Sequence, residues 1–312
     1  MLVSIATEAA PKRHRGDLGE DIGEASGDAD RHARTRANRD PNRTMIGAAT
    51  EGGNTNEDYV AATSDAIVLL DGGGAASGAE SGCSHGVPWY VRSLGAALLG
   101  DLAHNDGPLA QILTDGIAHV GSLHGTSCDL SHPGSPSAAV VMMRRTAGTM
   151  DFLVLANAVI VLDIGLTEPM VIRDERPLRA GYRSRPAAEH TNASGHRGRA
   201  LWAASGDPTA AEQSLTGSVP ADQARAAALL SAGASRLVDR FSLISWRQLL
   251  ALVARHGPAE AIRQARAAED SDPTGERWPR TPLHDDASVA YWEFTARPPR
   301  TGPLSSSGTS SR

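Results

Sequence analysis

The chain has 312 residues, enough for one large domain or two small ones, and 40% of them are hydrophobic, which is ample for a buried core. Its net charge of −6, from 30 basic and 36 acidic residues, gives no electrostatic attraction to nucleic acid or to an anionic membrane. Two cysteines do not make a disulfide scaffold, and the N-terminus lacks the basic start and long apolar stretch of a signal peptide. We therefore expect a cytoplasmic protein with neither a nucleic-acid nor a membrane partner.

The N-terminal region predicts a short strand followed by a long polar segment. Residues 1–10 contain the apolar stretch LVSIA, whereas residues 11–53 are rich in Gly, Asp, Arg and Asn and have no apolar period. Such a segment cannot bury enough apolar surface to order itself, and its interleaved acids argue against a basic nucleic-acid arm. We expect a flexible insertion over 11–53, a folded domain over 54–296 and a disordered Pro- and Ser-rich tail over 297–312.

Apolar residues at helical spacing predict two amphipathic helices that should form one outer layer on a sheet. The first begins at Pro88 and the second follows Pro108. Two further helices are predicted over residues 245–257 and 258–268, and residues 207–217 predict a short helix that ends at a glycine. The apolar positions are Val91, Leu94, Leu98 and Leu102 in the first helix and Leu109, Ile112, Leu113, Ile117, Val120 and Leu123 in the second.

Strands are predicted wherever short apolar runs lie between turn-forming residues. The breaks at residues 144–149 and at Asn157-Ala158 are hairpin-like, so the strands should pair mainly antiparallel. The order of strands, two helices, strands, two helices and a last strand suits a sheet sandwich with helices outside. The predicted strands are 2–6, 59–62, 66–70, 138–143, 150–156, 159–163, 170–173, 226–231 and 287–295.

Acidic residues stand at the ends of three of these strands. The run AIVLLDGGG ends at Asp71 and three glycines, Asn56-Glu57-Asp58 precedes YVAA, and Asp285-Asp286 precedes the last strand. Each corner alone is typical of an ordinary turn, where Asp and Asn are common. Three such corners together indicate a site for hard divalent cations, which prefer carboxylate and carbonyl oxygen.

The order of these motifs resembles the PP2C-like (PPM-type) metal-dependent serine/threonine protein phosphatases, most closely a PP2C-like group from actinobacteria. The resemblance also rests on SPSAAVV, LTGSV, SAGASRLVD and HDDASV, and it extends over most of the chain. It implies an α+β fold, a four-layer sandwich of two mainly antiparallel sheets flanked by helix pairs. It also implies two Mn²⁺ or Mg²⁺ ions that activate a water to attack the phosphorus of a phosphoserine or phosphothreonine protein.

The resemblance assigns a role to each acidic corner. It implies that Asp71 bridges both ions, that Gly72 offers its carbonyl, and that Asp285 completes the first ion. Glu57 and Asp58 would hold the second ion or its waters. Asp58, Asp71 and Asp285 are accordingly the expected catalytic residues.

The sequence departs from the family at three places in this site. Ser231-Ala232-Gly233 stands where the family has Ser-Asp-Gly, so the two-metal site lacks one ligand at Ala232. Ala156-Asn157-Ala158 replaces a Gly-Asp-Ser turn, and residues 52–55 (GGNT) stand where the family usually carries a phosphate-holding arginine. We therefore expect a phosphatase whose activity is weak or lost. The alternative is a non-catalytic pseudophosphatase that binds a phosphorylated or regulatory protein.

The sequence also contains residues that are typical of other kinds of site. The glycines after Asp71 have the wrong spacing for a dinucleotide loop, and Cys83 is too far from the next arginine for a cysteine phosphatase. The spacings of Cys83, His85, His124, Cys128 and His132 permit a zinc site, although lone Cys and His in loops beside helices more often pack or cap. We expect both thiols to be reduced and metal-free, with zinc as the open alternative.

Overall fold

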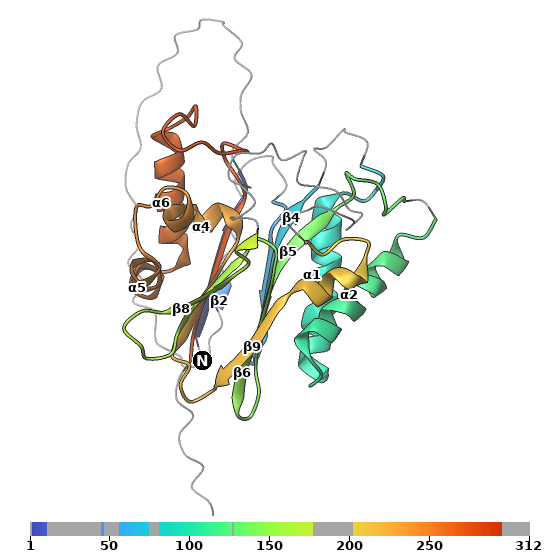
Figure 1. Cartoon of the computed structure of the whole chain (residues 1–312), viewed down its shortest axis with the longest axis horizontal. Helices are drawn as coiled ribbons and strands as arrows, with labels where there is room; N and C mark the ends of the chain where they lie inside the picture. Colours follow the sequence, from blue (N-terminus) through green and yellow to red (C-terminus); the bar gives the residue numbers. More distant parts are fainter. Residues whose placement is uncertain are drawn as a thin grey trace, which may run out of the picture.

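Two β-sheets pack face to face, and helices cover the outer surface of each sheet (Figure 1). The computed structural model describes residues 2–10, 45–46, 56–74, 81–126, 128–176 and 202–294. The chain thus forms the four layers that the sequence predicts. No helix within these ranges is long and apolar enough to cross a lipid bilayer.

The first sheet has five antiparallel strands in the order β3-β4-β5-β6-β9. One face of this sheet meets the other sheet and the opposite face meets helices, so its central strands are apolar along their length. In β4, Val68 and Leu70 pack towards the helices, whereas Ile67 and Leu69 pack between the sheets. The strands are β3 Tyr59–Ala62, β4 Ala66–Gly73, β5 Ser137–Arg145, β6 Thr149–Leu155 and β9 Leu215–Pro220.

The second sheet has six strands in the order β2-β1-β11-β10-β7-β8. All its pairs are antiparallel except β1 with β2, which is parallel. In β10, Ala227 and Leu229 face the interior of the sandwich, while Ala228 and Leu230 face the outer helices. The strands are β1 Leu2–Glu8, β2 Met45–Ile46, β7 Val159–Asp163, β8 Met170–Arg173, β10 Ala226–Leu230 and β11 Ala287–Glu293.

Helices α1 (Val87–His104) and α2 (Leu109–Leu123) cover the first sheet, as their apolar faces predict. Three helices, rather than a pair, cover the second sheet. These are α4 (Ala232–Asp239), α5 (Trp246–His256) and α6 (Pro258–Asp270). The start of α5 is fixed by a capping box, in which the Ser245 and Gln248 side chains each bond the other residue's backbone N–H.

Residues 207–217 do not form the predicted helix that ends at a glycine. A 3₁₀ helix, η3 (Pro208–Gln213), ends earlier, and Gly217 lies inside strand β9. The strand is at the edge of its sheet, and most of its residues are exposed, so it carries no apolar alternation to reveal it. A glycine suits position 217 because a Cβ there would lie 2.5 Å from the ring of Phe152.

The break at Asn157-Ala158 is a crossover between the two sheets and not the predicted hairpin. Strand β6 belongs to the first sheet and β7 to the second. Ala156 adopts a left-handed conformation, with φ of 70°, at the point where the chain changes sheets. The predicted apolar face of α2 also differs at its end, because Leu123 is 50% exposed.

The expected insertion over 11–53 and tail over 297–312 lie outside the described residues, apart from Met45–Ile46 in β2.

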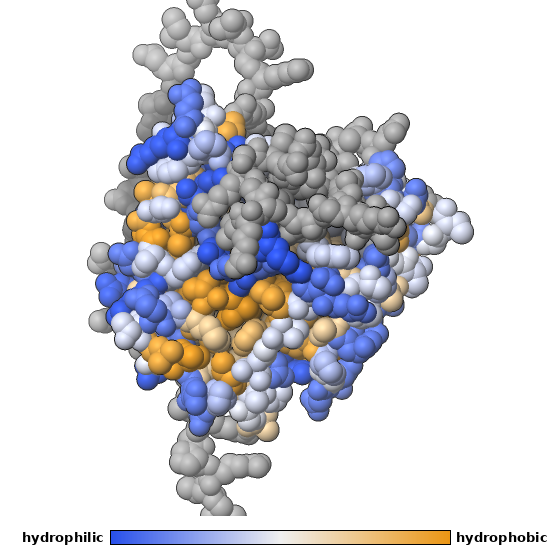
Figure 2. Space-filling model, in the orientation of Figure 1, coloured by the Kyte–Doolittle hydropathy of each residue, from blue (hydrophilic) through white to orange (hydrophobic). Residues whose placement is uncertain are grey.

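On the face seen in Figure 2, apolar residues gather between β8 and β9, where the interior of the sandwich reaches its edge. Met170, Ile172 and Val219 pack against the interior and are only partly buried.

Candidate metal centre

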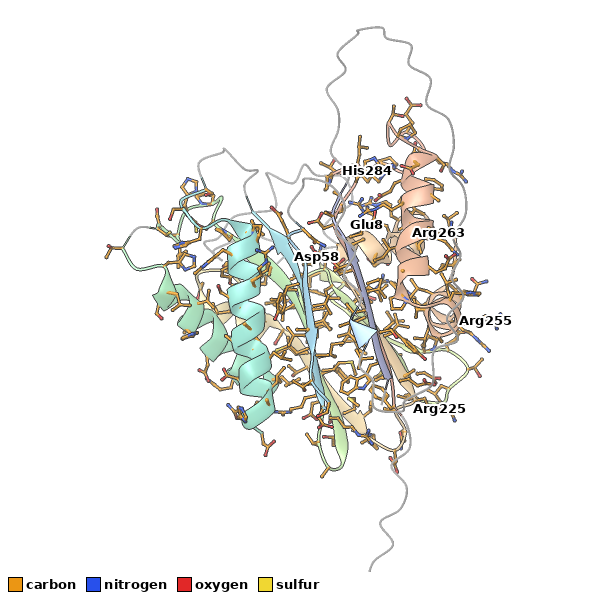
Figure 3. All side chains as sticks on the ribbon, turned by 180° about the vertical axis from the view of Figure 1, so that it is seen from behind. Glu8, Asp58, Arg225, Arg255, Arg263 and His284 are labelled. Carbon is orange, nitrogen blue, oxygen red and sulfur yellow. The ribbon has the colours of Figure 1, made fainter. Side chains whose placement is uncertain are left out.

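Acidic residues of the first sheet meet at one end of the sandwich. Asp71 lies near the end of β4, and Glu57-Asp58 directly precede β3, the antiparallel neighbour of β4. Continuing the pairing of Tyr59 with Leu70 by one residue places Asp58 opposite Asp71. Figure 3 shows Asp58 at this end, between the two sheets.

The second sheet brings its own strand ends to the same place. Ala232 follows β10 and Asp285 precedes β11, which is the antiparallel neighbour of β10. A hydrogen bond joins the two sheets here, because the backbone N–H of Ala232 donates to Asp71 Oδ2 at 2.6 Å. The position that lacks the expected carboxylate therefore lies directly beside Asp71.

Asp286 makes another connection between the sheets, a role that the sequence did not suggest for it. Its Oδ2 accepts the backbone N–H of Glu57 and its Oδ1 that of Ala10, both at 2.6 Å. The Asp285-Asp286 doublet thus places one carboxylate in the cluster and uses the next one to hold the Glu57 backbone.

The cluster of carboxylates raises the pKa values of its members. Burial, together with Asp286 and Asp285, raises the pKa of Glu57 to about 7. Burial and the charges of Asp285 and Asp286 likewise raise the pKa of Asp71 to about 7, against the Ala232 N–H and Arg236, which lower it. The metal-free cluster therefore holds protons near neutral pH, and a bound cation would displace them.

Asp58 is the least satisfied member of the cluster. It is 8% exposed, and neither of its carboxylate oxygens accepts a hydrogen bond of good geometry within the described residues. Burial, followed by the charge of Asp71, holds its pKa well above its usual range, and the nearby Ser288 hydroxyl lowers this pKa only in part. A buried carboxylate in this state is stable only if it is protonated or if it binds a cation.

Asp285 already has a cationic partner. Arg236, on α4, pairs with Asp285 at 3.0 Å and with the buried Glu269 at 2.6 Å. It also donates to the carbonyl of Pro282 at 3.1 Å. Arg236 lies one helical turn after Ala232, so α4 lacks the expected acid at its first residue and supplies a guanidinium to the same cluster.

Two glycines allow the backbones to approach at this end. A Cβ on Gly72 would clash with the carbonyl oxygen of Glu57, and it would lie 2.7 Å from Val87 Cγ1 at the start of α1. A Cβ on Gly233 would clash with the carbonyl oxygen of Asp286. The glycines after Asp71 and Ala232 are therefore needed for close packing.

Asn157 also lies at this end of the sandwich. The crossover that contains it leads into β7, where Val159 pairs with Leu230, the last residue of β10. The structure thus brings together Glu57, Asp58, Asp71, position 232 and Asp285, with Gly72 next to them. Their roles as metal ligands stay predictions.

Sequence reasoning missed Arg236 as a member of the site. A signal for it was present, because residues 232 and 236 share one face of a helix, but nothing in the sequence shows which acids that face meets.

Solved structures of known proteins resemble this chain in fold. A sex-determining protein from C. elegans matches with a TM-score of 0.50 and 13% identity, over 78% of this chain and 62% of that chain. The serine/threonine phosphatase Stp1 from Staphylococcus aureus matches with a TM-score of 0.49 and 11% identity, over 78% of this chain and 91% of that one. The serine/threonine phosphatase PstP from Mycobacterium tuberculosis matches with a TM-score of 0.48 and 16% identity, over 79% of this chain and 95% of that chain.

The chain has the two-sheet sandwich with helices on both outer faces that is expected of the PP2C-like fold. No protein-family model matches its sequence, and no curated protein matches it either. At the low identities above, the likeness to solved PP2C-like structures concerns the fold and does not extend to activity.

Proposed function

We propose that this chain is a PP2C-like, metal-dependent protein serine/threonine phosphatase whose hydrolysis is weak or lost. The observation that carries the proposal is the buried Asp58 carboxylate, which lies opposite Asp71 and has no ion-pair partner among the described residues. The raised pKa values of Glu57 and Asp71 support the same conclusion, since the cluster has more negative charge than its surroundings neutralise.

The residues of this site fit a hard divalent cation such as Mn²⁺ or Mg²⁺, because the available donors are carboxylate and carbonyl oxygens. Asp71 would bridge two ions, with the Gly72 carbonyl as a further ligand. Asp285 would complete the first ion, and Glu57 and Asp58 would hold the second ion or its waters. When bound, such ions supply an activated water and neutralise the charge of a phosphoryl group.

Two features of the chain limit this chemistry. Ala232 donates its peptide N–H to Asp71, but its methyl side chain gives the metal no ligand, whereas an aspartate at this position would. Arg236 holds Asp285 in an ion pair, so an ion at that corner has to compete with a guanidinium. The loss of one acid and the neutralisation of another both weaken cation binding on the side of the second sheet.

The Arg236–Asp285 ion pair also favours a second candidate function. A guanidinium at this corner neutralises part of the cluster without a metal, which suits a non-catalytic module that binds a phosphorylated or regulatory protein. The two candidates differ in turnover and share the fold.

Metal-dependent hydrolysis of p-nitrophenyl phosphate and of a phosphothreonine peptide tests the proposal. We expect slow turnover that requires Mn²⁺ and falls at least about tenfold in Asp71→Asn, because a carboxylate ligand is lost. Asp65→Asn, which changes an exposed aspartate in the turn between β3 and β4, should leave the rate unchanged.

A rate that is independent of Mn²⁺, or equal in Asp71→Asn and wild type, would contradict the assignment of this site. Binding of Mn²⁺ and of the phosphopeptide without turnover would select the second candidate.

A further inference from the structure

Two cysteines and two histidines meet beside the start of α1 and the end of α2. Cys83 and His85 lie just before α1, His124 caps the end of α2, and Cys128 lies in the loop after α2. The potential ligand atoms of Cys83, His85 and His124 all lie within 4.8 Å of one another. Residues from the segment before α1 and from the end of α2 therefore point into one small volume.

The spacing of the Cys83, Cys128 and His85 ligand atoms matches three corners of a tetrahedral zinc site, and His124 lies beside them. The two Sγ atoms are 3.7 Å apart, and His85 Nδ1 lies 3.8 Å from Cys83 Sγ and 3.4 Å from Cys128 Sγ. With Zn–S bonds of about 2.3 Å and Zn–N bonds of about 2.0 Å, tetrahedral geometry places two sulfurs about 3.8 Å apart and a sulfur and a nitrogen about 3.5 Å apart. A disulfide requires its sulfurs to lie about 2.05 Å from each other, much closer than they are here.

His124 is oriented as a metal-binding histidine is. It is 2% exposed, and its Nδ1 lies 2.9 Å from the carbonyl oxygen of Val120. Because a carbonyl oxygen only accepts, Nδ1 must carry the proton, and Nε2 is then the ring atom with a lone pair. A histidine that binds a metal usually donates its other N–H to a carbonyl or carboxylate in this way, which fixes the ring.

The loops that carry these residues are held by backbone hydrogen bonds. The N–H of His85 donates to Cys83 Sγ at 3.3 Å, and the N–H of Asp129 donates to the carbonyl of Gly82 at 2.7 Å. Gly82 has a φ of +69°, and a Cβ there would lie 2.6 Å from the carbonyl oxygen of Asp129. The chain thus keeps both loops close to each other without relying on the thiols.

We propose that Cys83, His85, His124 and Cys128 form a structural zinc site that ties the start of α1 to the end of α2. Four protein ligands complete a tetrahedral shell, which leaves no open position for catalysis. Thiolate and imidazole select zinc, whereas the oxygen donors of the acidic cluster select Mn²⁺ or Mg²⁺, so the two sites take different metals. His132, a fifth candidate from the sequence, is excluded from the shell because its Nδ1 accepts the N–H of Gly134 at 3.1 Å.

The zinc site would also position part of the candidate metal centre. Val87 follows His85 by two residues, and its methyl groups lie against Gly72 and Gly74, within 2.8 Å of where a Cβ on either glycine would stand. Fixing the start of α1 therefore fixes Val87, which packs on the end of β4 just after Asp71. This differs from the expectation of metal-free, packing cysteines.

Metal analysis of the untagged full-length chain, purified without chelator, tests the site. We expect one zinc per chain in the wild type and in the control His119→Ala, which alters an exposed histidine of α2. Cys83→Ser and Cys128→Ser should each lose the metal, and zinc removal should lower the melting temperature of the wild type. Replacing zinc by Co²⁺ in the wild type should give the intense visible absorption of a tetrahedral cobalt–thiolate centre, a readout that needs no variant to fold.

Three results would overturn the proposal. The first is a wild-type chain that holds less than about a tenth of an equivalent of zinc after incubation with zinc and dialysis. The second is a Cys83–Cys128 disulfide in the freshly purified protein, found by mass spectrometry. The third is a bound Co²⁺ without sulfur-to-cobalt charge transfer, which would place the ion at other residues. None of these results bears on turnover at Asp71, so the zinc site and the proposed function fail separately.

Discussion

Ala232 and Arg236 stand one turn apart on α4, and together they set the charge at the corner of the second sheet. Ala232 contributes a peptide N–H to Asp71, and Arg236 contributes a positive charge to Asp285. A cation site built from acids on both sheets thus keeps both carboxylates of its first-sheet half, Asp58 and Asp71, whereas its second-sheet half lacks one acid and has another paired with a guanidinium. Asymmetry between the two halves is the basis of the proposed weak activity.

At Gly72 a single added methyl group should disturb the site. In Gly72→Ala, the new Cβ would clash with the Glu57 carbonyl, so the backbone before Asp58 has to move. We expect the free energy of unfolding to fall by about 1–3 kcal/mol, measured by urea unfolding, and Mn²⁺ binding to weaken.

Gly100→Ala is the matched control for Gly72→Ala. A Cβ on Gly100, within α1, meets no atom within 4 Å, so alanine should raise the free energy of unfolding by about 0.5–1 kcal/mol through its helix propensity. If both substitutions stabilise the protein, the strand end at Gly72 is not closely packed against Glu57.

At the scale of elements, α4, α6 and the segment before β11 are joined through one buried carboxylate. Glu269 of α6 is 0% exposed, and it pairs with Arg236 of α4 at 2.6 Å and with Arg266 of α6 at 2.8 Å. His284, in the segment before β11, has its Nδ1 atom 3.1 Å from Oε2 of Glu269. Glu269 therefore fixes the guanidinium that in turn pairs with Asp285.

Glu269→Gln should destabilise the protein strongly, because it removes the fully buried carboxylate that Arg236 and Arg266 share and leaves each guanidinium with only one, more exposed, acidic partner. The expected loss is about 3–5 kcal/mol in the free energy of unfolding, from urea denaturation. Glu260→Gln, which removes the partner of Arg263 in an exposed pair on the same helix, should change stability little. Similar losses in the two variants would show that the Glu269 network is not what holds α4 to α6.

The sequence predicted the helices better than the edges of the sheets. The faces of α1 and α2 have a strong period because both pack on a buried sheet, so Leu94, Leu98 and Ile112 could be recognised. Strand β9 could not be recognised from the sequence, because an exposed edge strand is polar and its Gly217 is typical of a turn. The crossover after β6 could not be distinguished from a hairpin, because both strands are apolar whichever sheet they join.

For the molecule as a whole, the acidic cluster should make metal-free stability depend on pH. Burial and the neighbouring carboxylates raise the folded-state pKa values of Glu57 and Asp71 to about 7, above their values of about 4 in the unfolded chain. Between these values the folded chain binds more protons, so this contribution to stability is full below pH 4 and is lost as the pH rises through 7.

We therefore expect Mn²⁺ to raise the melting temperature more at pH 8 than at pH 5.5, because at low pH protons compete with the ion. Thermal unfolding with and without Mn²⁺ at the two values of pH measures this effect. Asp71→Asn should reduce the difference, and a stabilisation by Mn²⁺ that is equal at both values would show that the ion binds elsewhere.

The composition of the site was partly predictable from the sequence, and its charge balance was not. The acidic corners stood out because Asp and Glu flank strands in a recognisable order, and the fold brings them to one end of the sandwich. The Arg236–Asp285 pair and the Glu57–Asp286 contact depend on how two sheets and a helix meet in space. Spacing along the chain carries no information on such contacts.

Calorimetric titration with Mn²⁺ of the wild type and of Ala232→Asp tests the central claim most directly. The Ala232 N–H lies 2.6 Å from Asp71 Oδ2, so an aspartate there adds a charged ligand beside the cluster. We predict that Ala232→Asp binds Mn²⁺ at least about tenfold more tightly than the wild type. Ala251→Asp, which adds the same charge at an exposed position of α5, should bind it as the wild type does. Equal affinities in Ala232→Asp and the wild type would contradict the assignment of this cluster as a PP2C-like metal centre.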